Sequence, residues 1–178
     1  MHRHADDGRG NVLNKTITTM LQIFQDALFA AIAAIGFAAI STPPRRAYLL
    51  CAMIAAAGHS ARFVLMADGL TRMHIIPATL AAAFITGTLA VFLSPTIKTP
   101  AETCLFPALL PMVPGIYAYK SFGGLALCVM AGSESGFMHG FHLFAANGLT
   151  CGLILLCMVS GATAPVFLFK KISFQATR

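Results

Sequence analysis

The stretch His74-Ile-Ile-Pro-Ala-Thr-Leu-Ala-Ala-Ala-Phe-Ile-Thr-Gly-Thr-Leu-Ala-Val-Phe-Leu93 decides the fold class of this chain. It contains no charged residue between its ends. About 20 consecutive apolar residues in an α-helix are enough to cross the hydrocarbon core of a bilayer. We therefore predict a transmembrane helix over residues 74–93.

The remainder of the chain has the same character. Of its 178 residues, 57% are hydrophobic and 10% are charged, and the mean hydropathy is +0.77. Soluble domains carry about 25% charged residues, so this composition cannot form a water-soluble surface. The length is enough for four or five spans and leaves no room for a separate soluble domain.

Four further apolar stretches complete the organisation, at about residues 19–40, 47–66, 104–131 and 140–169. We predict an all-α integral membrane protein of about five helices, formed by a single transmembrane domain over residues 19–171. Residues 1–18 are expected to be a flexible polar tail, and residues 172–178 a short basic tail. A four-span model stays open. A cleaved secretory signal is the alternative for the first stretch, although Asp26 interrupts its apolar run.

Prolines dominate the fourth stretch. Pro111, Pro114 and Gly115 make an unbroken helix unlikely there, and we expect the helix to be kinked or split. A helix that starts after Gly115 would offer unpaired N–H groups and a positive dipole end to a carboxylate. We therefore predict that these three residues, with Tyr119 and Lys120, contact a substrate. The alternative is a structural kink with its tyrosines at the membrane interface.

Basic residues lie singly or in pairs at the edges of the apolar runs. This placement fits membrane topology better than nucleic-acid binding, despite a net charge of +6. In a five-span model one side holds Arg45, Arg46, Lys98, Lys170 and Lys171. The positive-inside rule makes that side cytoplasmic, with the N-terminus outside and the C-terminus inside.

Three polar residues at membrane depth call for an explanation, since charge in a bilayer is costly. Asp26 and Arg62 lie roughly 10 and 6 Å below the outer ends of their helices, which are antiparallel neighbours. We predict a direct pair between them, and the alternative is that Arg62 reaches the interface alone. His59 precedes Arg62 by three residues and is a candidate for proton coupling, although a buried neutral histidine is common.

No cofactor or metal is expected. His139 and His142 lie near Glu134, but two histidines without a third firm ligand are weak evidence for a metal. The five cysteines lie in apolar stretches without a CxxC motif and are expected to be core residues. No phosphate-binding loop or catalytic triad is recognisable, so we predict no enzyme.

Glycines recur every four residues in the last stretch. Gly132, Gly136 and Gly140 share this spacing, and Gly148 and Gly152 repeat it. Small residues on one helical stripe allow two helices to approach closely. We expect this stripe to pack against another helix.

Several stretches together resemble the small (YjjB-like) subunit of the threonine/serine exporter family. They cover roughly residues 20–122 and match in order and spacing. They comprise Gln25-Asp26 leading to Gly36-Phe-Ala38, Pro44-Arg-Arg-Ala47, Ala57-Gly-His-Ser-Ala-Arg62, Ala78 to Gly87, and Pro111-Met-Val-Pro-Gly-Ile-Tyr-Ala-Tyr119. The residues before Thr19 have no counterpart, and those after Ser121 match loosely.

The resemblance implies a multi-pass subunit of the bacterial inner membrane that works with a larger membrane partner, as a hetero- or homo-oligomer. It implies export of a hydroxy amino acid or of a dicarboxylate such as succinate. The alternative is a non-transporting subunit that stabilises or regulates the partner. The expected partners are therefore membrane lipid, another protein chain and a small-molecule substrate, and no nucleic acid is expected.

Overall fold

The computed structural model describes residues 3–67 and 71–170, and these form helices joined by short turns. In chain order the helices are α1 (Arg3–Ser41), α2 (Arg45–Met66), α3 (Ile75–Leu93), η1 (Ser94–Ile97), α4 (Ala101–Leu109), η2 (Leu110–Met112), α5 (Gly115–Met130) and α6 (Glu134–Leu168). No strand occurs among the described residues. The predicted all-α class is confirmed.

Four helices are long and apolar enough to cross a membrane, and a bent pair makes a fifth if it crosses as one span. The pair joins residues 101–112 to residues 115–130 with a bend of 52°. The predicted break in the fourth stretch is therefore confirmed. Its cause is local, because Pro111 lies in η2, and Pro114, which has no N–H, stands directly before α5.

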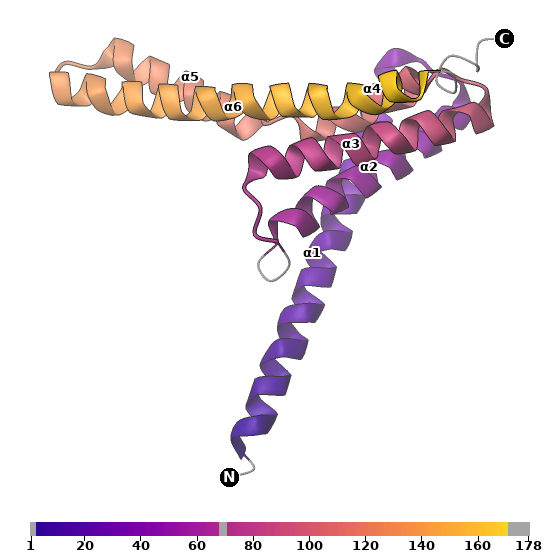
Figure 1. Cartoon of the computed structure of the whole chain (residues 1–178). Helices are drawn as coiled ribbons and strands as arrows, with labels where there is room; N and C mark the ends of the chain where they lie inside the picture. Colours follow the sequence, from indigo (N-terminus) through magenta and orange to yellow (C-terminus); the bar gives the residue numbers. More distant parts are fainter. Residues whose placement is uncertain (1–2, 68–70, 171–178) are drawn as a thin grey trace.

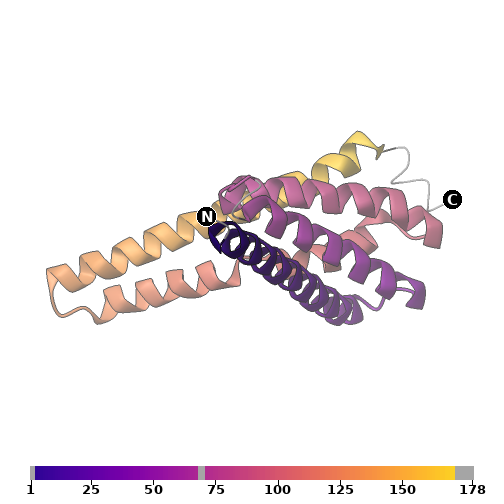
Figure 2. The same cartoon turned by 90° about the horizontal axis from the view of Figure 1, so that it is seen from below.

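Two parts of the molecule extend in different directions from a common bundle (Figure 1). The N-terminal half of α1 extends away from the other helices, and α5 with the first half of α6 forms a long hairpin that extends in another direction. Figure 2 shows the same hairpin beyond the end of the bundle. The core lies where the second half of α1 meets α2, α3, α4 and the end of α6.

This core is built mainly from small side chains. Its buried members include many alanines, together with Leu50, Ile54, Val91 and Met112. Inside a bilayer there is little hydrophobic gain from helix association, so close packing of small residues does most of the stabilising. The alanine-rich core therefore suits a membrane bundle.

The expectation of a flexible polar tail over residues 1–18 stays a prediction, but the described part of this segment is helical. Helix α1 begins at Arg3 and runs without interruption to Ser41. Adding residues to an existing helix is much easier than starting one, so the apolar segment can carry its polar N-terminal extension. Thr18 and Thr19 continue the helical pattern by donating to the carbonyls of Asn14 and Lys15. Residues 171–178, including the expected basic tail, lie outside the described residues.

Glycines set the closest helix contacts, although only part of the predicted stripe takes part. A side chain at Gly140 would meet the backbone of Cys128 in α5, and one at Gly148 would meet Ser121. Nothing lies within 4 Å of the positions that side chains would occupy at Gly132 and Gly152. The stripe packs α6 against α5 along its middle, and its two ends do not contribute.

Candidate functional site

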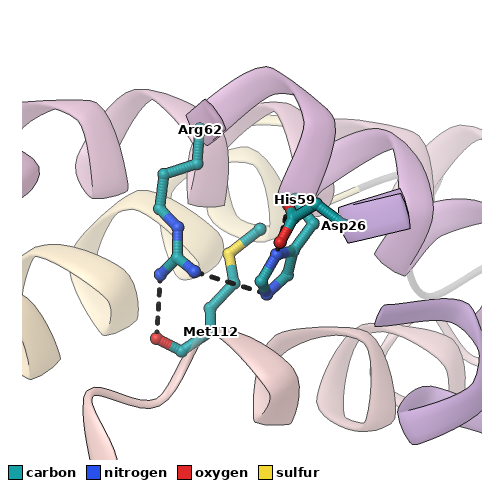
Figure 3. A network of polar contacts seen from close by, with 4 residues as sticks. All are labelled: Asp26, His59, Arg62 and Met112. Carbon is teal, nitrogen blue, oxygen red and sulfur yellow. Dashed lines mark hydrogen bonds and ion pairs between the residues drawn. The ribbon is translucent and has the colours of Figure 1, made fainter. Parts of the chain in front are cut away.

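A chain of polar contacts joins three helices near the end of α2 (Figure 3). Asp26 comes from α1 and His59 from α2, and the Oδ2 atom of Asp26 lies 2.9 Å from Nδ1 of His59. The side chain of His59 is 10% exposed and that of Asp26 is 34% exposed. The histidine is thus enclosed, while the carboxylate still reaches the surface of the chain.

Arg62 extends this network from the next turn of α2. Its Nη2 atom lies 3.4 Å from Nε2 of His59, and its Nη1 donates to the backbone oxygen of Met112 over 3.1 Å. Since a guanidinium can only donate, Nε2 of His59 is the acceptor. The remaining proton of a neutral imidazole is then on Nδ1, from which it is donated to Asp26.

The helix break supplies the carbonyl that Arg62 binds. In an unbroken helix the oxygen of Met112 would accept from the amide of Ile116. The chain instead bends at Pro114, and α5 sets off in a new direction. The freed carbonyl points towards Arg62 (Figure 3), so the predicted break and the predicted charged residues form one site.

The prediction that Asp26 and Arg62 contact each other directly is wrong. Both residues belong to one network, but His59 lies between them and contacts each. A close α2–α3 contact explains how His59 fits there, since Gly58 lies directly against Thr86 of α3 and against Met112. The similar depths of Asp26 and Arg62 in their helices predict that the two residues lie close together. They do not predict that His59 lies between them. A role for His59 in proton coupling stays a prediction.

Two adjoining clefts lie beside this network. The first, of about 290 Å³, is lined by Asp26 and Arg62 together with Phe63, Met66, Ala67 and Ile75. The second, of about 440 Å³, is lined by Lys15, Thr18, Thr19 and Gln22 of α1, and by Phe63 and Ala67. Phe63 and Ala67 line both clefts, so the clefts adjoin each other. Each cleft is also lined by residues of α1, and the two clefts follow one another along that helix.

Sequence reasoning missed the polar face of α1. Steps of three or four residues lead from Lys15 to Thr18 and Thr19, then to Gln22 and to Asp26, which places these residues on one side of a helix. The helical spacing was a readable signal. The expectation of a flexible polar tail over residues 1–18 divides this stripe between two segments, which hides its helical spacing.

None of the predicted substrate contacts at the break lines either of these two clefts. Gly115, Tyr119 and Lys120 are exposed on α5, whereas Pro114 is buried and Pro111 is partly buried. The amide of Gly115 donates to Val113 O, and the amides of Tyr117 and Ala118 donate to Pro114 O. The expectation that this helix start offers a set of free N–H groups is therefore wrong for these three amides.

The remaining candidates lie outside the polar network. His139 and His142 are exposed on α6. Among residues 3–67 and 71–170, no group of three metal-ligating side chains comes together. The five cysteines are free, and Cys51 and Cys104 lie in the core.

Comparison with known proteins agrees with this architecture. A protein of Haemophilus influenzae (strain ATCC 51907 / DSM 11121 / KW20 / Rd), described as an uncharacterized protein, is 33% identical over 168 residues. The match covers 94% of this chain and 54% of the relative, so the chain spans about half the length of the curated relative it matches. No solved structure matches.

The family comparison includes the residues of the polar network. The model of the family described as "Threonine/Serine exporter, ThrE" matches residues 26–168. That range begins at Asp26, includes His59, Arg62 and the break at Pro114, and ends with α6. On this evidence the chain is a multi-pass membrane protein that belongs to the threonine/serine exporter family.

Proposed function

We propose that this chain is one half of a two-part exporter in the bacterial inner membrane, which moves a small hydrophilic amino acid or carboxylate out of the cell. Its partner would be a larger membrane subunit of the same family. The family assignment supports transport, and the match to about half of a longer relative supports a second half. We propose no enzymatic activity.

The position of one exposed cation, Lys120, carries the argument for a partner. Lys120 is exposed on α5, ten residues before the end of that helix at Met130. At 1.5 Å per residue this is about 15 Å from the helix end, near the middle of a bilayer core about 30 Å thick. A cation facing lipid at that depth is costly, so a partner or an aqueous path should cover it.

Copurification from the native membrane tests the partner. The tagged chain should bring with it a larger membrane protein, and Lys120→Met should reduce the recovered amount at least several-fold. Lys98→Met is the matched control, because Lys98 is an exposed lysine in a turn after η1. Recovery of this chain alone, or equal recovery with both variants, would contradict the two-part arrangement.

Cells without the chain test the direction of transport. Deletion of its gene should raise intracellular threonine and serine after feeding with a dipeptide that contains them, and should slow their appearance in the medium. Restoring the gene should reverse both effects. Unchanged efflux would contradict export and would favour a structural or regulatory role for the chain.

A dicarboxylate such as succinate is the second candidate substrate, and the same lysine favours it. A cation near the path attracts a dianion more strongly than a zwitterion, whose own ammonium it repels. If Lys120 contacts the substrate, Lys120→Gln should slow dicarboxylate export more than threonine export. If the helix break also contacts the substrate, Gly115→Leu should slow export of both substrates. Folding should be unaffected, because nothing lies within 4 Å of the new side chain's first carbon. Normal efflux from cells with the Gly115→Leu variant would show that the helix break is not part of the substrate site.

A further inference from the structure

We propose that the cleft between α1 and the end of α2 is a binding site for a zwitterionic α-amino acid, with Asp26 holding the ammonium and Arg62 holding the carboxylate. The inference rests on the proposed export function and assigns the place of its substrate site. It moves the substrate site from the exposed residues of α5 to the polar network. The argument starts from two opposite charges that line one cleft without being joined to each other.

Both charged groups keep binding capacity. The Oδ2 atom of Asp26 is engaged by His59, and its other oxygen makes no hydrogen bond or ion pair with the described residues. Arg62 has five N–H donors, of which one is directed to His59 and one to Met112 O. Both side chains line the same cleft, so a ligand there can meet a carboxylate and a guanidinium at once.

The spacing of the two charges suits an amino acid. Asp26 and Arg62 are separated by one imidazole ring and its two hydrogen bonds (Figure 3). An α-amino acid carries its ammonium and carboxylate on one carbon, and it bridges a gap of similar length when each group makes one hydrogen bond. The ring of His59 does not line the cleft, and it holds the two charged side chains apart from behind.

The volume and the other lining residues point to a small ligand. A cleft of about 290 Å³ is at the lower end of the range for small-molecule sites. Phe63, Met66, Ala67 and Ile75 give it apolar walls. A dicarboxylate of similar length would place one of its carboxylates against Asp26, and this repulsion selects against it.

The second cleft gives the ligand a route. Lys15, Thr18, Thr19 and Gln22 line it and continue along one face of α1 to Asp26. Hydroxyl, amide and ammonium groups can replace part of the water around a zwitterion as it moves. The polar face of an otherwise apolar helix thus leads to the site.

Ligand-induced stabilisation of the protein purified from its native membrane tests the site. A ligand that binds the folded state raises its unfolding temperature. The series consists of threonine, N-acetylthreonine without the ammonium, threonine methyl ester without the carboxylate charge, and succinate. We expect threonine to reach a given shift at a concentration at least about tenfold below each of the others, since each lacks one charged hydrogen bond.

Two variants assign the charges. Asp26→Asn keeps an acceptor for His59, and it should bind threonine and N-acetylthreonine within about threefold of each other while still preferring threonine to its ester. Arg62→Gln should show the opposite pattern. Glu102→Gln and Arg46→Gln are the matched controls, because both residues are exposed away from the clefts, and they should behave as the unaltered protein does.

Several outcomes would overturn the inference. Equal binding of threonine and N-acetylthreonine by the unaltered protein would do so without any variant, even if a variant failed to fold. Stabilisation by succinate and not by threonine would overturn it as well, while leaving an exporter of carboxylates in place. Loss of all ligand effects together with unchanged efflux in deletion cells would remove both this inference and the proposed function.

Discussion

At the scale of single residues, the polar network provides hydrogen-bond partners for two charged side chains inside a membrane protein. A neutral histidine lies between Asp26 and Arg62, and a backbone carbonyl freed by a helix break receives the second guanidinium nitrogen. Each of these bonds involves a charged partner and is stronger than a neutral one. The arrangement satisfies the two charges without joining them, which leaves both available to a ligand.

Exchanging the two charges should not restore the protein. A carboxylate at position 62 would face the oxygen of Met112 instead of donating to it, and a guanidinium at position 26 would face the protonated Nδ1 of His59. We expect Asp26→Arg with Arg62→Asp to give no more folded protein than the poorer single variant, measured by size-exclusion chromatography of membrane extracts. A direct ion pair would behave differently, because exchange preserves it. Recovery of yield in the double variant would therefore contradict the network.

Only part of this network could be predicted from the sequence. The identities of Asp26, His59 and Arg62 were predictable, because polar residues at membrane depth are rare and costly. Their order was not, since it depends on how closely α2 approaches α3 at Gly58 and on the direction of the chain after Pro114. Both are properties of packing between segments far apart in sequence.

At the scale of helices, the closest contacts are made where glycine replaces a side chain. Gly161 of α6 lies against the backbone oxygen of Leu80 in α3, and Gly87 of α3 lies against that of Ala162. The two glycines form a reciprocal contact that lets α3 and α6 approach closely. This contact joins the end of the long hairpin helix to the core.

A methyl group at Gly161 should loosen this contact. Gly161→Ala places a carbon against rigid backbone, and overpacking of this kind costs about 1–3 kcal/mol. We expect a fall of several degrees in the unfolding temperature of the purified protein. Gly152→Ala is the matched control in the same helix, since nothing lies within 4 Å of the added carbon and alanine favours helix more than glycine does. An equal fall in both variants would show that the effect is not due to the α3–α6 contact.

Prediction of the helices succeeded where the local signal was strong. The apolar stretch over residues 74–93 became α3 at Ile75–Leu93, and the proline-rich stretch became a bent pair. At the N-terminus, the polar composition gave no signal for the helical turns that begin at Arg3. A helix already formed in the apolar segment can extend through polar residues, which composition alone does not show.

At the scale of the whole molecule, the position of the cleft relates the fold to the direction of transport. The cleft lies at the end of α2 that carries Met66 and Ala67, close to the start of α3 at Ile75. In the five-span arrangement with the N-terminus outside, this end of α2 is the outer one. The site would then lie on the side where an exporter releases its substrate, and the extended half of α1 would lead outwards from it (Figure 1).

Labelling with a membrane-impermeant maleimide tests this orientation in intact cells. The five native cysteines are first changed to alanine, and a single cysteine then replaces Arg72, Arg46 or Lys98. All three positions are exposed, either between helices or at a helix start. We expect position 72 to react, because it belongs to the α2–α3 turn beside the cleft. Positions 46 and 98 should react only after the cells are opened, because they lie at the opposite ends of α2 and α3. The reverse pattern would place the cleft on the cytoplasmic side, where it would load the substrate instead of releasing it, and would require the N-terminus to be inside.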